Sequence, residues 1–287
     1  MLSKLRHRAF SLRRAVTTGL CLLGLLAHEA WAHALAGQRL FPATLSFDDP
    51  GVVSELPLVV THMPGDTTIA AALSKTLTSK LGFSIAKSYA PDQGPGAWQN
   101  GTLALAYQLF RNGQHESIGM LQIADTVGGT GSVPWSIYTP EFAFGQGLGE
   151  LPHRARMLRP LAFSGAVSVD LPDHAGLTRT LNWGVSAQYS LPYLQDFVRD
   201  EGIRGVWRNL IPIVEFPMQR CESGACAGQT TGDINPGVIW VGHDYQLGLE
   251  ASLPVNSRSG HGVGVVLGVD FYLDDLSPHH FGRPLLE

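Results

Sequence analysis

The stretch from Tyr245 to Asp275 constrains the fold of this chain most, because it reads as two long strands joined by a loop. Side chains alternate between the two faces of a strand, so an alternating sequence gives one apolar face and one polar or small face. The first strand alternates Leu247, Leu249, Ala251 and Leu253 with Gln246, Gly248, Glu250 and Ser252. The second alternates Val263, Val265, Leu267, Val269, Phe271 and Leu273 with Gly264, Val266, Gly268, Asp270, Tyr272 and Asp274. Such strands of about ten residues are typical of a membrane β-barrel, whereas strands of soluble sandwiches are usually nearer five or six.

The same alternation recurs along the chain and predicts further strands. Residues 66–89 indicate a hairpin that turns near 78–80, although the sequence from Thr67 to Leu81 also suits a helix. The other predicted strands lie near 101–110, 115–127, 161–171, 181–191, 206–218 and 237–245. We therefore predict an all-β fold, an antiparallel up-and-down transmembrane β-barrel of about ten strands, in the range of eight to twelve.

Four parts of the chain follow from this interpretation. Residues 1–32 have a basic start, a short apolar run and an Ala-Trp-Ala site, which together predict a cleaved signal peptide. Residues 33–65 are broken by prolines and are predicted to form an entry segment on the periplasmic side or a short strand. The barrel is assigned to residues 66–275 and a C-terminal tail to 276–287. We expect the outer membrane as the location.

One long segment, Gly128 to Pro160, is rich in glycine, proline and aromatic residues and is predicted to be a large external loop. Its aromatic residues are expected either at the membrane interface or folded inward: Trp135, Tyr138, Phe142 and Phe144.

The charge and the cysteines narrow the function classes further. The chain has 20 basic and 24 acidic residues, and residues 1–32 hold five of the former and one of the latter, so residues 33–287 carry a net charge of 15 − 23 = −8. This balance argues against nucleic acid as a partner. Beyond the signal, Cys221 and Cys226 are separated by four residues, and in an oxidising envelope they are predicted to form a disulfide. A pair of metal ligands is the alternative interpretation, but no nearby residues offer convincing ligand spacing.

Several phrases of the sequence resemble a known group of proteins. They are YQLF at 107–110, FGQGLGELP at 144–152, LNWGVSAQYSLPYL at 181–194, LIPIVEF at 210–216, NPGVIW at 235–240, YQLGLEASLPVN at 245–256 and FYLDD at 271–275. The chain resembles uncharacterised exported proteobacterial proteins that are similar in style to outer-membrane barrels of the meta-pathway phenol-degradation type. The resemblance implies a barrel and a putative transport role, and it carries over no catalytic residue.

The resemblance also implies membrane lipid and the barrel-insertion machinery as partners. One departure concerns the latter. Many such barrels end in an aromatic residue, whereas this chain ends PLLE, and Phe271 and Tyr272 lie near the end of its last predicted strand.

Six polar residues are predicted to face the lumen and contact an unidentified small-molecule solute. They are Gln108, Gln188, Gln246, Glu250, Asp270 and Asp274. Such a lining favours cations or hydroxylated solutes. The alternative is that these side chains are hydrogen-bonded inside a narrow, filled barrel or lie on the solvated face of a sandwich.

No cofactor, no resident metal and no catalytic residue is predicted. His115 and Glu116 would point to opposite faces of a strand, and Asp274-Asp275 with His279-His280 match no metal-ligand spacing. The predicted function is a channel or transporter for a small solute. The rivals are a soluble periplasmic β-sandwich or lipocalin-like binder, and a barrel enzyme acting on lipid or polysaccharide.

Overall fold

In a computed structural model, the chain is described over residues 34–286. The predicted signal peptide lies outside these residues. The described part contains a β-hairpin and a closed antiparallel barrel of twelve strands, in the order β10-β11-β12-β13-β14-β3-β4-β5-β6-β7-β8-β9. No helix of the described part is long and apolar enough to span a membrane. The fold class is therefore the predicted one, with a strand number at the upper limit of the predicted range.

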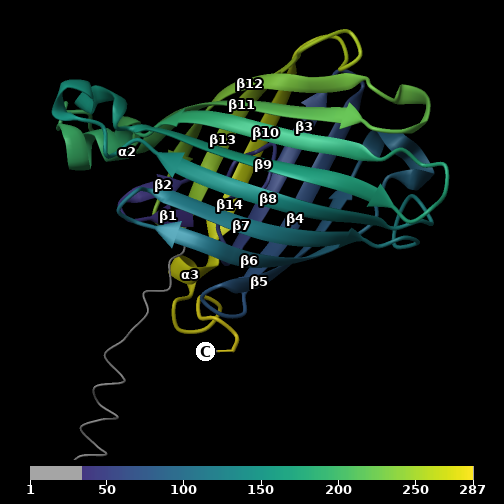
Figure 1. Ribbon diagram of the computed structural model, residues 1–287, viewed down its shortest axis with the longest axis horizontal. Helices are drawn as coiled ribbons and strands as arrows, with labels where there is room; N and C mark the ends of the chain where they lie inside the picture. Colours follow the sequence, from purple (N-terminus) through teal and green to yellow (C-terminus); the bar gives the residue numbers. More distant parts are fainter. Residues whose placement is uncertain (1–33, 287) are drawn as a thin grey trace, which may run out of the picture. The chain divides into compact units, whose positions relative to one another are not determined.

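The strands run up and down around the barrel, and each pairs with its neighbours along the chain (Figure 1). The hairpin consists of β1 (Ala34–Ala36) and β2 (Arg39–Phe41). The barrel strands are β3 (Glu55–Met63), β4 (Asp66–Thr76), β5 (Leu81–Tyr89), β6 (Thr102–Asn112), β7 (Ser117–Thr126), β8 (Ile137–Gly147), β9 (Leu161–Pro172), β10 (Thr180–Tyr189), β11 (Leu210–Cys221), β12 (Thr230–Val241), β13 (Tyr245–Pro254) and β14 (Gly264–Tyr272). Pairing of β14 with β3 closes the barrel.

One of these strands was predicted only as an alternative, and one was not predicted. β3 lies in the predicted entry segment, so the barrel begins at Glu55 and not at residue 66. β8 lies inside the predicted external loop. Prolines and glycines interrupt the alternation of both strands, so the sequence pattern did not indicate them clearly. In the structure the prolines are nevertheless part of the strands: Pro57 of β3 pairs with Asp270, and Pro140 of β8 pairs with Ile123. The region from Asp66 to Tyr89 forms the predicted hairpin and not the alternative helix.

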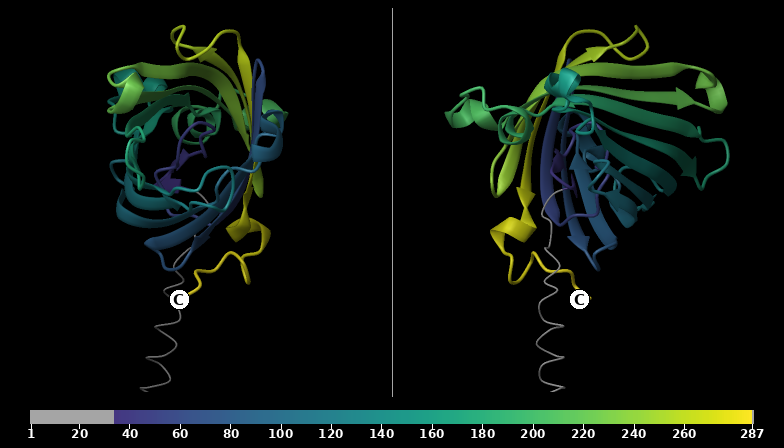
Figure 2. Two further views of the ribbon diagram at one scale, coloured as in Figure 1. Left: turned by 90° about the vertical axis from the view of Figure 1, so that its right-hand side faces the viewer. Right: turned by 60° about the vertical axis from the view of Figure 1, so that its left-hand side comes forward.

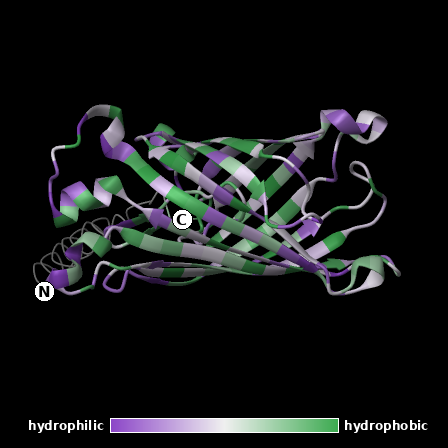
Figure 3. Cartoon of the chain, turned by 90° about the horizontal axis from the view of Figure 1, so that it is seen from above, coloured by the Kyte–Doolittle hydropathy of each residue, from purple (hydrophilic) through white to green (hydrophobic). Residues whose placement is uncertain are grey.

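The alternation places the apolar side chains on the outside. Leu247, Leu249, Leu253, Val265 and Leu267 are exposed, whereas Gln246, Glu250, Ser252, Val266 and Asp270 on the same two strands are buried. Figure 3 shows hydrophobic and hydrophilic residues mixed along the strands and many hydrophilic ones in the connections. A closed barrel with an apolar exterior is the architecture that satisfies every backbone hydrogen bond in lipid. The soluble sandwich considered as a rival is therefore wrong.

The two ends of the barrel differ. The terminal end, on the left in Figure 1, holds the β1–β2 hairpin, α2 (Leu191–Tyr193) in the 190–209 connection, and α3 (Leu273–Leu276) after the last strand. The far end holds the connections 64–65, 90–101, 127–136, 173–179, 222–229 and 255–263. The shortest is Pro64-Gly65, where Gly65 has φ +86°, a conformation that a tight turn requires and that glycine adopts without steric cost.

The predicted disulfide is present. Cys221 and Cys226 are bonded across the β11–β12 connection at the far end, with their Cα atoms 5.6 Å apart. The residues after α3 fold back onto the terminal end, where the amides of Leu285 and Leu286 donate to the carbonyls of Thr76 and Leu77 at 3.2 and 2.9 Å.

Candidate functional site: the lumen and its N-terminal plug

Residues 42–54, between β2 and β3, run through the inside of the barrel, and we call them the plug. Figure 2 shows this purple segment within the barrel wall when the barrel is viewed from the far end. Ser46 of the plug accepts a hydrogen bond from Asn235, which lies near the middle of β12, at 2.8 Å. The plug therefore reaches the middle of the barrel before it returns to the terminal end at Glu55.

Side chains of the wall hold the plug by its backbone. Gln246 accepts from the amide of Ala43 at 3.2 Å and donates to its carbonyl at 2.7 Å. Glu215 accepts from the amide of Leu45 at 3.1 Å. Gln108 accepts from the amide of Val52 at 3.1 Å and donates to the carbonyl of Pro50 at 3.3 Å. These bonds satisfy backbone groups that would otherwise be buried without partners.

Apolar side chains of the N-terminal segment rest on wall glycines. A Cβ at Gly184 would lie 2.4 Å from Phe47, one at Gly268 would lie 2.4 Å from Leu45, and one at Gly82 would lie 2.7 Å from Val52. Real Cβ atoms do not approach other carbons this closely, so these wall positions accommodate the plug only as glycine. At these three inward glycines, side chains of the plug therefore occupy the space beside the wall.

The six residues predicted to face the lumen can now be placed. Gln108, Gln188, Gln246, Glu250 and Asp270 are on barrel strands and are buried inside the barrel. Gln108 and Gln246 bind the plug and so follow the alternative interpretation of a filled barrel. Asp274 was placed wrongly: it belongs to α3 beyond the last strand, where its carboxyl faces Ser54 and Lys75 at the terminal end. Contact of any of these residues with a solute stays a prediction.

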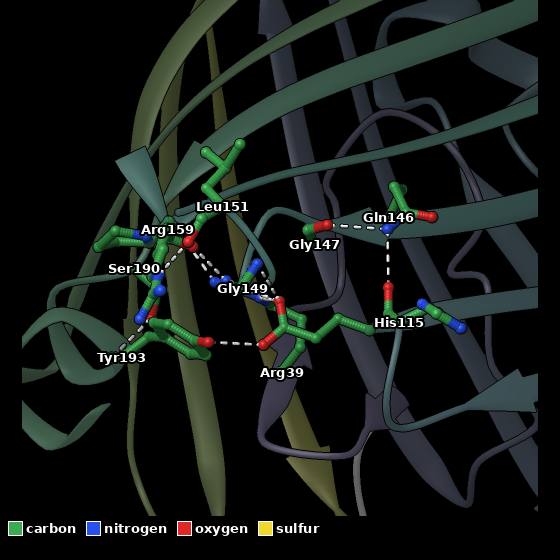
Figure 4. Close-up of polar contacts among 11 residues, drawn as sticks. Arg39, His115, Gln146, Gly147, Gly149, Leu151, Arg159, Ser190 and Tyr193 are labelled. Carbon is green, nitrogen blue, oxygen red and sulfur yellow. Dashed lines mark hydrogen bonds and ion pairs between the residues drawn. The ribbon is translucent and has the colours of Figure 1, made fainter. Parts of the chain in front are cut away.

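Sequence reasoning missed the polar cluster at the terminal end (Figure 4). Arg39, Glu116 and Tyr193 come from β2, the β6–β7 turn and α2, and all three side chains are buried. Nε and Nη2 of Arg39 donate to Oε2 of Glu116 at 3.1 and 3.0 Å, and Oη of Tyr193 donates to Oε1 at 2.6 Å. Burial, followed by the hydrogen bond to Glu116 and the charge of Glu116, raises the pKa of Tyr193 to about 12, so the phenol remains a donor at neutral pH.

The prediction that His115 and Glu116 lie on a strand is also wrong, because both belong to the turn before β7. The expected divergence of their side chains holds for another reason. His115 points outward and pairs with exposed Glu150 at 2.9 Å, whereas Glu116 points into the barrel.

Two cavities flank the plug. One, of about 460 Å³, lies between Ser46 and Phe47 of the plug and wall residues that include Asn182, Gln219 and Arg258. The second, of about 340 Å³, is lined by Asp48, Asp49, Glu55 and Glu141 among many alanine, serine and threonine residues. The first reaches Ser259 in the β13–β14 connection, so it is a vestibule at the far end whose floor is the plug.

The ionisable side chains that line these cavities are mostly acidic. They comprise Asp48, Asp49, Glu55, Glu141 and Asp233, with Arg258 as the one base. Carboxylates in such a lining would attract cations and repel anions. Within residues 34–286, no group of three or more His, Cys, Asp or Glu residues is arranged to hold a metal ion.

Comparison with known proteins supports the barrel fold and does not identify a family. No protein-family model matches the chain, and no curated protein sequence matches it. Among solved structures, it is similar to NanC porin, with a TM-score of 0.51 and 8% identity, over 76% of this chain and 99% of that chain. It is also similar to KdgM porin (TM-score 0.49, 10% identity, 76% and 98% covered) and to LpxR from Salmonella typhimurium (TM-score 0.44, 13% identity, 76% and 100% covered).

Proposed function

We propose that this chain is an outer-membrane protein that admits a small neutral or cationic solute to its lumen from the far end and passes it across the membrane. The observation that carries the proposal is the vestibule, a cavity of about 460 Å³ enclosed by a barrel with an apolar exterior. Its size is in the range of ordinary small-molecule sites. Its amide, hydroxyl and carboxylate lining suits hydroxylated or positively charged solutes.

The acidic lining of the two cavities is the reason for expecting neutral or cationic solutes. An anionic solute would face five carboxylates and one guanidinium along the two cavities. Carboxylate rings are how cation channels select their ions, and the same field would exclude acidic sugars.

Three observations on other proteins and on the sequence bear on the proposal. The similar structures NanC and KdgM are named porins. The sequence resemblance to outer-membrane barrels of the phenol-degradation type also supports a transport role. A channel role also fits insertion by the barrel-assembly machinery, for which the Phe271-Tyr272 pair at the end of β14 would supply the aromatic strand end.

We favour no enzymatic role. The buried cluster of Arg39, Glu116 and Tyr193 is the most constrained polar group that we find, but its members satisfy one another. Both oxygens of Glu116 accept hydrogen bonds, and the Arg39 guanidinium also donates to the carbonyls of Arg159 and Pro160. No group of this cluster is left to act on a substrate.

The test is an ion-selectivity measurement in planar lipid bilayers. The purified protein is placed in a tenfold gradient of potassium chloride, and the reversal potential of its openings is measured. We expect potassium to carry most of the current. In liposome swelling, three solutes of nearly equal size should enter in the order glucosamine, glucose, glucuronate. Anion-selective openings, or fastest entry of glucuronate, would contradict the proposal.

A further inference from the structure

The N-terminal segment is fixed to the wall at the terminal end by a latch, which we define as Arg39, Glu116 and Tyr193 (Figure 4). The Arg39 side chain is fully buried, and its guanidinium carbon lies 3.7 Å from the centre of the Tyr193 ring. Its Nη1 donates to the carbonyl of Pro160 at 3.0 Å. Arg39 therefore joins β2, which leads directly into the plug, to three separate connections of the barrel.

The backbone is distorted to place the carboxylate of Glu116 on Arg39. Glu116 has φ +46°, and among the described residues it is the one non-glycine residue with a positive φ. That conformation is unfavourable for a side chain with a Cβ, and it persists where the surroundings hold it. The Gly149 amide donates to Oε2 of Glu116 at 3.0 Å. A Cβ at Gly147 or Gly149 would lie 2.1 or 2.3 Å from the Glu116 oxygens, so both neighbours make room for the carboxylate.

The rest of the plug meets the wall through hydrogen bonds. Of the ion pairs found in residues 34–286, Arg39–Glu116 is the one that joins residues 34–54 to the wall. Deeper in the barrel, Asp48 lies beside Glu141 and accepts a hydrogen bond from Gln122, and Asp49 lies near Asp270 and Glu215. The plug is thus held by one buried ion pair and by hydrogen bonds.

We propose that the plug is a displaceable gate and that the latch holds it closed. With the plug in place, Ser46 and Phe47 form the floor of the vestibule. When the latch is broken, only hydrogen bonds hold the plug, and its departure opens a path past that floor. The proposal goes beyond the proposed function, because it can be tested by the position of the plug as well as by conduction.

The first experiment measures conductance in planar bilayers for the wild type, Glu116→Gln and Glu150→Gln. Glutamine keeps the size of Glu116 and removes the charge that holds Arg39. Glu150→Gln is the matched control, since it breaks the exposed pair with His115 beside the same turn. We expect the wild type to be closed most of the time, Glu116→Gln to raise the mean conductance at least tenfold, and Glu150→Gln to match the wild type.

The second experiment reports the position of the plug without relying on conduction. The side chains of Ser46 and Asn235 are 2.8 Å apart, so cysteines at both positions should form a disulfide when the plug is in place. We expect rapid crosslinking of Ser46→Cys/Asn235→Cys and at least tenfold slower crosslinking when Glu116→Gln is added. Once crosslinked, the triple variant should be closed, and reductant should reopen it. The single Glu116→Gln variant, treated in parallel, reports the effect of reducing Cys221–Cys226.

The outcomes separate the two proposals. Slower crosslinking without conductance would support the gate and contradict passage of solutes. A wild type that conducts as well as Glu116→Gln, or crosslinking that is equally fast in both backgrounds, would overturn the gate. If Glu116→Gln gives no heat-modifiable barrel band on a gel, Tyr193→Phe replaces it, because it removes only the 2.6 Å hydrogen bond to Glu116. Unchanged crosslinking and conductance in that variant would equally overturn the gate.

Discussion

Leu249 and Glu250 are neighbours on β13 that should respond in opposite ways when their chemistry is exchanged. Leu249 is the fifth residue of the strand, is 49% exposed on the outside and pairs with Val238 and Leu267. In Leu249→Glu a carboxylate would face lipid near mid-strand, at a cost of about 2 kcal/mol. Loss of the leucine from its apolar surroundings adds about 2 kcal/mol. We expect Leu249→Glu to destabilise the barrel by about 4 kcal/mol.

Glu250 has 1% exposure and faces Glu215 inside the barrel. Glu250→Leu replaces one of two facing carboxyls by an apolar side chain of similar size, so we expect stability to change by about 1 kcal/mol or less. Urea titration of protein folded into phospholipid vesicles measures both changes, and the heat-modifiable band on a gel reports whether the barrel forms. Equal stability of the two variants, or greater loss in Glu250→Leu, would refute the assignment of faces on which the membrane orientation depends.

The other predictions concern the wall glycine beside the plug, the disulfide and the C-terminal tail. Gly184→Val places its Cβ 2.4 Å from Phe47 and should lower stability by about 1–3 kcal/mol, measured by the same urea titration, whereas Gly101→Val, whose Cβ would meet no atom closer than 3.7 Å, is the control without the clash. Replacing both Cys221 and Cys226 by serine should cost about 2 kcal/mol at most because the closed loop is short, and two free thiols in an unreduced mass spectrum of the wild type would contradict the bond. Burial raises the pKa of Asp274 in α3 to about 6 from its ordinary value near 3.8, so the folded state binds more protons than the unfolded one between these values. Docking of the tail should therefore be strongest below pH 4 and weaken as the pH rises through 6. Hydrogen exchange at the amides of Leu285 and Leu286, corrected for intrinsic rates, measures this loss, and Asp274→Asn should abolish it.

The alternation of side chains was enough to predict the barrel, because lipid demands an apolar outer face wherever a strand crosses it. Leu247, Leu249 and Leu267 are exposed as that pattern requires, and Gln246 and Glu250 are buried. The pattern was harder to read where a proline interrupts it. Pro57, which faces the lumen, lies on β3, and Pro140, which faces outward, lies on β8.

The contents of the lumen could not be predicted in the same way. The plug has no periodic sequence, and its contacts join residues such as Ala43 and Gln246 that are 203 positions apart. The latch was missed because Glu116 lies in a turn and its partner Arg39 lies in a segment that resembles a connection. Only weak sequence features mark the plug and the latch. The hairpin before the plug has strands of three residues, and Gly147 and Gly149 are the glycines that make room for Glu116.

The route of the chain through its own barrel also determines the order of assembly. The plug precedes every barrel strand, yet its hydrogen-bond partners include residues of β6, β11, β12 and β13. Leu45 and Glu215 are separated by 170 positions, and Ser46 and Asn235 by 189. Contacts between such distant residues form late, because the intervening chain must be ordered first. The seam between β3 and β14 joins the first and last strands of the barrel, and the plug leads directly into β3. The plug is therefore expected to take its place late in assembly, when the strands that hold it are ordered and the seam brings the first and last strands together.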